Sequence, residues 1–324
     1  MGHRSFGIAT IVILGSILSF ARCGERAADR DAQLSFDTPD EAVAALVAAV
    51  GRPDMAGLQK LLGPGVADLL ASGDTVSDRR ERESFLARYR ERHKLVAGSP
   101  DDLVLNVGED EWPLPIPLVR RAGRWRFDGA AGVDEILLRR IGANELRTID
   151  VMQGFVAAQH EYAATGHDGA SAGVYARVLR STPGRHDGLY WEVAPEEPPS
   201  PAGPFLAAAV AEGYAANKPQ DARALTPYHG YLYRMLFSQG AAASVGARDY
   251  TVNGKLTGGF ALLARPYAYG KSGVMTFIVN QDGQVWQRDL GDETARLATA
   301  MERFDPDSTW TPIAPEEGRD VAQR

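Results

Sequence analysis

One short polar segment combines residues suited to binding and to proton transfer. His186 and Asp187 are adjacent, and Tyr190 and Trp191 follow closely. A histidine exchanges protons near neutral pH and a carboxylate can orient it, so this pair is consistent with acid–base chemistry. Side chains adjacent in sequence rarely face each other, however. We therefore interpret the segment as a binding loop with aromatic anchors.

A second segment, Tyr228-His229-Gly230-Tyr231, is also aromatic and polar. It suits the rim of a binding site, and the alternative is packing of its rings in the interior. The sequence contains no P-loop, and we assign no catalytic residue and no metal ligand. The candidate binding residues are His186, Asp187, Tyr190, Trp191, Tyr228 and His229.

Two loops are rich in the oxygen ligands that calcium prefers, Asn280-Gln281-Asp282-Gly283 and Asp305-Pro306-Asp307-Ser308. Neither has the full spacing of an EF-hand, and turn chemistry accounts for both. We predict no cofactor, with calcium at these loops as the alternative.

Helices are predicted to precede strands in the first part of the chain. Thr38-Pro39-Asp40-Glu41 has the pattern of a capping box and predicts a helix start, and a second helix is predicted over 54–62. Residues 77–94 mix Arg and Glu, which is typical of a solvated amphipathic helix. The alternative for 77–94 is a basic patch for an anionic partner. Residues 95–127 are predicted to be extended, with a hairpin whose turn contains Gly123.

The strongest helical periodicity covers residues 133–164, although Gly142 and a capping Asn144 leave open a division into two helices. Residues 166–204 are rich in Gly and Pro, a composition typical of a functional or mobile insertion. Further helices are predicted at 174–179, 205–214 and 294–301. Strands are predicted at 231–236, 249–252, 260–264, 274–280 and 284–288, with turns at Asn253-Gly254 and 281–283.

The N-terminal segment indicates where the protein acts. Residues 6–21 are apolar and uncharged, and they are short for a membrane span but suited to an export signal. Cleavage, lipid anchoring at Cys23 and an uncleaved anchor are the three alternatives. Cys23 is the only cysteine in the chain, so an internal disulfide is excluded. We predict a periplasmic or other extracytoplasmic location, with membrane contact through this segment alone.

The C-terminal block GFALLARPYAYGKSGVMTFIVNQDGQVWQRDLG, together with FDPDSTW and LRSTPGRHDGLYW, resembles a family of exported bacterial proteins of unknown function. Residues 36–129 are similar in pattern to the cone-shaped nuclear-transport-factor-2-like fold. Residues 143–310 resemble the globular part of pilins and pseudopilins, but the apolar stem of a pilin is absent from this helix. These resemblances imply export and architecture, and they imply no activity.

We predict an α+β protein of two domains, a cone-like domain followed by a long helix packed on an antiparallel sheet. The predicted boundaries are 1–23 for the signal or anchor, 24–35 for a linker, 36–130 and 131–312 for the domains, and 313–324 for a disordered tail.

The net charge of −7 and the pI near 5.5 argue against nucleic acid as a partner. We favour a non-enzymatic binding or interaction module for an envelope protein or a small ligand. The alternatives are a hydrolase-like site inside the first domain and a structural role in an envelope assembly.

Overall fold

The structure, a computed structural model, describes residues 33–52, 54–63, 66, 71–194, 196–204, 209 and 227–314. The predicted export segment lies outside these ranges, as do residues 24–32 of the linker, all but Ala209 of the predicted helix at 205–214, and residues 315–324 of the tail. Within the described ranges, no helix has both the length and the apolar character needed to span a membrane.

Three helices begin the described chain: α2 (Pro39–Gly51), α3 (Met55–Leu62) and α4 (Thr75–Glu91). The predicted capping box is confirmed, because Glu41 N donates to Thr38 Oγ1 at 3.2 Å and the Glu41 carboxylate accepts from the N–H of Thr38. The helix predicted over 77–94 ends three residues early. Residues 93 and 94 instead pair in a strand with Val107 and Asn106.

The first sheet has five antiparallel strands, in the order β1-β2-β4-β5 with β3 also paired to β2. They are β1 (His93–Ser99), β2 (Asp102–Val107), β3 (Trp112–Pro113), β4 (Leu118–Arg121) and β5 (Arg124–Phe127). The predicted hairpin is confirmed. Its two-residue turn has positive φ at both Ala122 (49°) and Gly123 (77°), which matches the twist of the flanking strands.

Helices α2 and α3 and this sheet enclose one apolar core. Its buried members include Leu46, Leu61, Leu105, Leu118 and Phe127. Gln33 Nε2 donates to the carbonyls of Leu61 (3.0 Å) and Phe127 (2.6 Å), which fixes the start of the described chain against this core.

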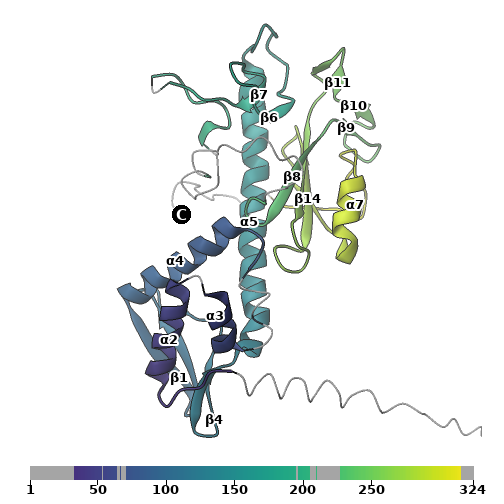
Figure 1. Cartoon of the computed structure of the whole chain (residues 1–324). Coiled ribbons are helices and arrows are strands. Elements are labelled where there is room, and N and C mark those ends of the chain that lie inside the picture. The colour runs from purple at the N-terminus through teal and green to yellow at the C-terminus, as the bar shows by residue number, and fades with distance from the viewer. Residues whose placement is uncertain are drawn as a thin grey trace, which may run out of the picture.

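Helix α5 (Gly129–Ala164) is a continuous helix of 36 residues that starts beside the first sheet and extends to the opposite end of the molecule (Figure 1). The predicted alternative of two helices divided near Gly142 and Asn144 is wrong. Asn144 does not cap a helix; its Nδ2 donates to the carbonyl of Ser272 at 2.9 Å. A glycine inside a helix lowers stability without breaking the hydrogen-bond ladder, so Gly142 is tolerated here.

The insertion after α5 contains a parallel pair of short strands, β6 (Val178–Arg180) and β7 (Gly188–Tyr190). The helix predicted at 174–179 is therefore wrong. Tyr175 N donates to the carbonyl of Leu256, and buried Gln159 bonds both backbone groups of Ala176 at 3.0 Å. These long-range partners hold the segment extended and override its local helical pattern.

The second sheet is antiparallel and has the order β16-β15-β14-β13-β8. Its strands are β8 (Tyr231–Leu236), β13 (Ala261–Pro266), β14 (Met275–Asn280), β15 (Trp286–Asp289) and β16 (Thr311–Pro312). The C-terminal part of α5 packs on β13 and β14, as Figure 1 shows. The prediction of a long helix on an antiparallel sheet within an α+β protein is confirmed.

The remaining elements are β9 (Ser238–Gln239), β10 (Arg248–Asp249), β11 (Thr251–Val252), β12 (Lys255–Leu256), the 3₁₀ turn η2 (Gly291–Glu293) and α7 (Thr294–Ala300). Asn253 and Gly254 form the predicted turn, with φ of 52° and 77°. Ile313 N donates to the carbonyl of Val285, so the predicted disordered tail begins at least one residue too early.

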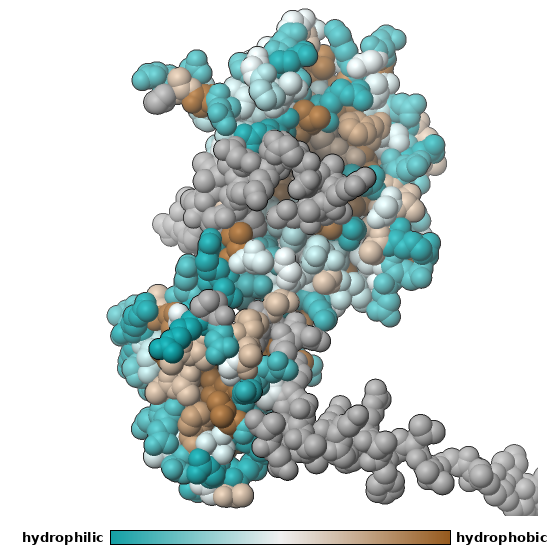
Figure 2. All heavy atoms as spheres, in the orientation of Figure 1, coloured by the Kyte–Doolittle hydropathy of each residue, from teal (hydrophilic) through white to brown (hydrophobic). Residues whose placement is uncertain are grey.

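A second apolar core lies between α5 and the second sheet, with Met152, Phe155, Phe260, Leu263 and Phe277 among its buried members. On the face drawn in Figure 2, hydrophilic residues spread over both ends of the molecule and hydrophobic residues gather in small groups. The two cores are separate clusters connected by α5.

Candidate functional site

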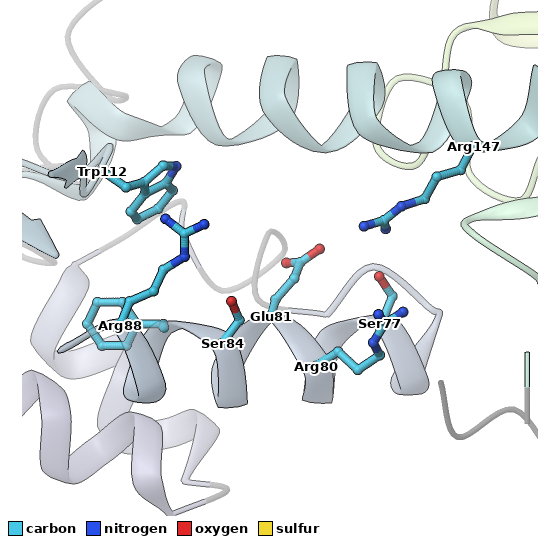
Figure 3. Close-up of a pocket in the computed structure, with 8 residues that line it drawn as sticks. Ser77, Arg80, Glu81, Ser84, Arg88, Trp112 and Arg147 are labelled. Atoms are coloured by element: carbon cyan, nitrogen blue, oxygen red, sulfur yellow. The ribbon is translucent and has the colours of Figure 1, made fainter. Parts of the chain in front are cut away.

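A cleft of about 350 Å³ lies between α4 and α5 (Figure 3). All eight lining residues are drawn there and seven are labelled, and they come from three parts of the fold. Helix α4 supplies most of them, α5 supplies one arginine and β3 supplies one tryptophan. The lining residues are Ser77, Arg80, Glu81, Ser84, Phe85, Arg88, Trp112 and Arg147.

The spacing on α4 explains why its side chains converge. Residues 77, 81, 84 and 88 recur at intervals of three and four, so they share one face of the helix. The N-terminus of α4 is fixed by Asp74, whose Oδ1 accepts from Ser77 N at 3.0 Å. Asp78 adds a buried anchor, because it accepts from both the backbone N–H and the hydroxyl of Ser72. This face is therefore held in a defined position.

Three arginines and one carboxylate line the cleft. Arg88 Nη1 donates to both carboxylate oxygens of Asp110 (2.9 and 2.8 Å), which orders the guanidinium at one end. Arg147 points from α5 toward Glu81 in Figure 3, and both side chains contact solvent. Among the described residues, no carboxylate forms an ion pair with Arg147 within 4.0 Å. The lining thus carries three arginines and one glutamate in a chain whose net charge is −7.

Partial removal of the carboxylate from water inside the cleft raises the pKa of Glu81, although the residue stays exposed to solvent. The positive charges of Arg140 and Arg147 lower this pKa, whereas the nearby carboxylates of Asp78 and Asp74 raise it. The loss of hydration around the carboxylate thus outweighs the attraction of two guanidinium groups. A second anion in the cleft would raise the pKa of Glu81 further, as Asp78 and Asp74 do.

One of the sequence-predicted residues, His229, lies close enough to this cleft for Arg147 and Arg80 to act on its pKa, and Tyr228 precedes it in the same turn. His229 and Gly230 form a two-residue turn with φ of 51° and 74°, closed by hydrogen bonds between Tyr228 and Tyr231. His229 is buried, with 5 % of its surface exposed. Burial lowers the pKa of His229 to about 4, with Arg147 and Arg80 acting in the same direction and Asp74 opposing them. His229 is therefore neutral at pH 7 and belongs to the interior behind the cleft.

The other four predicted residues gather in the insertion. His186, Tyr190 and Trp191 line a second cavity of about 290 Å³. The Asp187 carboxylate accepts from the backbone N–H and the hydroxyl of Thr182 at 2.7 and 2.8 Å. The N–H bond from Thr182 contributes most to a lowered pKa of Asp187. Asp187 consequently shapes the loop, and no contact joins it to the His186 ring.

The sequence analysis did not select the residues of the α4–α5 cleft. A signal existed on α4, where the basic-patch alternative for residues 77–94 includes Arg80 and Arg88. Arg147 had no comparable signal, because its relation to α4 depends on how two distant helices approach each other.

One further motif in the sequence has the spacing of a catalytic site. Gly169-Ala170-Ser171-Ala172-Gly173 has the G-x-S-x-G spacing of serine hydrolases. That motif requires its serine between a strand and a helix. Ser171 lies in the loop between α5 and β6, so this context is missing here.

The two oxygen-rich loops satisfy their carboxylates internally. The Asp282 carboxylate accepts from the Ser244 hydroxyl and the Asn280 amide. The Asp307 carboxylate accepts from the backbone N–H and the hydroxyl of Thr309. In the part of the chain that the structure describes, no group of three or more His, Cys, Asp or Glu residues is placed to hold a metal ion.

Comparison with known proteins gives one match. A family model described as "Protein of unknown function (DUF2950)" matches residues 33–313, nearly the whole described chain. Neither the curated proteins nor the solved structures contain a significant match. The proposed similarities to nuclear-transport-factor-2-like and pilin folds stay predictions.

Proposed function

Since this chain belongs to the DUF2950 family, whose description names no function, we propose a function from its own geometry: a binding module for a small acidic ligand. The ligand would carry a carboxylate or phosphate group into the α4–α5 cleft. The observation that carries the proposal is Arg147, which points from α5 into a cavity whose opposite wall on α4 carries Arg80 and Arg88 (Figure 3). Guanidinium groups bind planar anions through paired, charge-assisted hydrogen bonds.

The size and walls of the cleft support this proposal. A volume of about 350 Å³ is in the range of small-molecule sites. Phe85 and Trp112 supply apolar surface beside the arginines, and the Arg139 guanidinium lies 5.0 Å from the Trp112 ring, which positions that wall. In an acidic protein, a positive cavity also concentrates anions locally.

The hydrolase alternative inside the first domain receives no support from the packing. The space between its helices and sheet is filled by apolar side chains, among them Leu46, Leu105 and Phe127. A catalytic site needs a cavity with converging polar groups. Among the described residues, the convergent polar groups lie outside this core, in the α4–α5 cleft.

The decisive experiment is isothermal titration calorimetry of the full chain with citrate and with inorganic phosphate at low ionic strength. Arg147→Gln should weaken binding at least about tenfold, whereas Glu81→Gln should strengthen it, because it removes a competing carboxylate. The matched control is Arg79→Gln on the outer face of α4, where Arg79 pairs weakly with Glu83 at 3.9 Å. It should change affinity less than about twofold.

Salt gives an independent readout, since about 0.5 M NaCl should weaken an arginine-based site strongly. The proposal fails if neither anion binds, or if Arg147→Gln and Arg79→Gln have equal effects.

We further infer that the protein acts outside the cytoplasm and consists of two domains. The predicted boundary between residues 36–130 and 131–312 moves into α5, because Val133 and Ile136 pack on the first core. The apolar run at 6–21 supports export, and the two separate apolar cores support the division. Mass spectrometry of the natively purified protein tests export. We expect a chain that starts after the apolar run or carries a lipid on Cys23, and an intact chain recovered from cytosol contradicts it.

A further inference from the structure

The insertion carries a second cavity, far from the α4–α5 cleft. Arg147 and Tyr162 are fifteen residues apart on α5, which corresponds to about 22 Å of helix. Tyr162 anchors the insertion, because its hydroxyl donates to the carbonyl of His186 at 2.7 Å. The cavity of about 290 Å³ opens between the loop 180–186 and the segment 190–192.

Stacked rings form one wall of this cavity. His186 stacks on Trp191 with ring centroids 4.3 Å apart and an interplanar angle of 20°. His167 lies behind, 5.4 Å from Trp191 and stacked on Tyr162 at 4.2 Å. Only Tyr162 of these is buried, whereas His186 is exposed. The wall is therefore a supported aromatic surface that remains open to solvent.

Charged groups surround this wall, and both arginines are paired with carboxylates. Arg180 pairs with Glu192 at 3.3 Å and lies 5.3 Å over the Tyr190 ring. Arg185 lies between Asp168 (3.5 Å) and Asp187 (3.8 Å). A charged ligand would have to displace an existing partner. A neutral ligand can instead use the remaining hydrogen-bonding capacity of these oriented groups.

We propose that this cavity binds a neutral carbohydrate. A sugar ring has an apolar face of C–H groups that suits an aromatic wall, and an edge of hydroxyls that suits oriented carboxylate and guanidinium groups. The exposed His186 ring, supported by Trp191 behind it, contacts the ring face, and Arg180 and Glu192 bind the hydroxyls. The proposal is independent of the acidic ligand of the α4–α5 cleft, because it rests on different residues.

The test is calorimetric titration of the full chain with three neutral trisaccharides: tri-N-acetylchitotriose, cellotriose and maltotriose. Titration to about 10 mM detects even millimolar affinity. At least one trisaccharide should bind, and Trp191→Ala should weaken it at least about tenfold. Trp112→Ala, in the other cleft, is the matched tryptophan control and should leave sugar binding unchanged.

A second variant covers the case in which Trp191→Ala does not fold. Glu192→Gln keeps the shape of the exposed side chain but removes its charge, and it should weaken sugar binding about threefold to tenfold. The proposal is overturned if none of the three sugars binds, if Glu192→Gln and a folded Trp191→Ala bind sugar like the unaltered protein, or if Trp112→Ala abolishes binding.

Discussion

Asp74 Oδ2 accepts the backbone N–H of Gly230 at 3.3 Å, which joins two positions 156 residues apart. The other oxygen of the same carboxylate caps α4 by accepting from Ser77 N. Close packing surrounds this joint, since a Cβ at Gly230 would lie 2.5 Å from Asn144 Nδ2. One buried carboxylate thus connects the start of α4 to the turn that precedes the second sheet.

Asp74→Asn should therefore destabilise the protein by about 1–3 kcal/mol. Asparagine caps a helix as well as aspartate, but its NH₂ group cannot accept from Gly230, so one buried donor loses its partner. The control is Asp54→Asn, because Asp54 caps α3 through Gly57 N at an exposed position. Its cost should be a few tenths of a kcal/mol. Urea unfolding measures both, and equal effects would contradict the role of this joint.

His229 should make the fold sensitive to acid. Its pKa falls from the ordinary value of 6.5 to about 4 in the folded protein, so between these values the unfolded chain binds the proton more readily. The contribution of neutral His229 to the free energy of unfolding is fully present above about pH 6.5. It is lost as pH falls toward 4, an effect on the order of 3 kcal/mol.

The test variant is His229→Asn, because asparagine tolerates the positive φ of this turn and does not titrate. Stability from urea unfolding should fall more steeply for the unaltered protein than for His229→Asn between pH 7 and 4.5. Parallel curves for the two proteins would show that the histidine is not held neutral.

Gly142→Ala should stabilise the protein by about 0.5–1 kcal/mol. A Cβ at this position meets no heavy atom of the described chain within 4 Å, and the residue lies inside continuous helix α5. Thermal unfolding should therefore give a higher Tm. Gly132→Ala is the contrasting variant, because its Cβ would lie 2.8 Å from the carbonyl oxygen of Pro115, and it should destabilise. A lower Tm for Gly142→Ala would indicate a break in the helix.

Local chemistry made much of the fold predictable. Two features were predicted correctly because they depend only on neighbouring residues: the capping box at Thr38 and Glu41, and the turn at Asn253-Gly254. The extended path at 174–179 was mispredicted, because it depends on Gln159 and Leu256, which are distant in sequence.

The candidate sites follow the same division between local and long-range signals. His186 and Trp191 are close in sequence and line one cavity, as an aromatic loop predicts. The α4–α5 cleft could not be predicted as a whole, because Arg147 meets the face of α4 only after both helices have packed.

The length of α5 has a consequence for any attempt to divide the chain. This helix extends for about 54 Å, and its first turns supply Val133 and Ile136 to the same apolar cluster as Leu62 and Phe127. A fragment that stops at residue 130 would expose to water the apolar surface that these two side chains cover. Any N-terminal fragment that folds on its own must therefore retain about two further turns of α5.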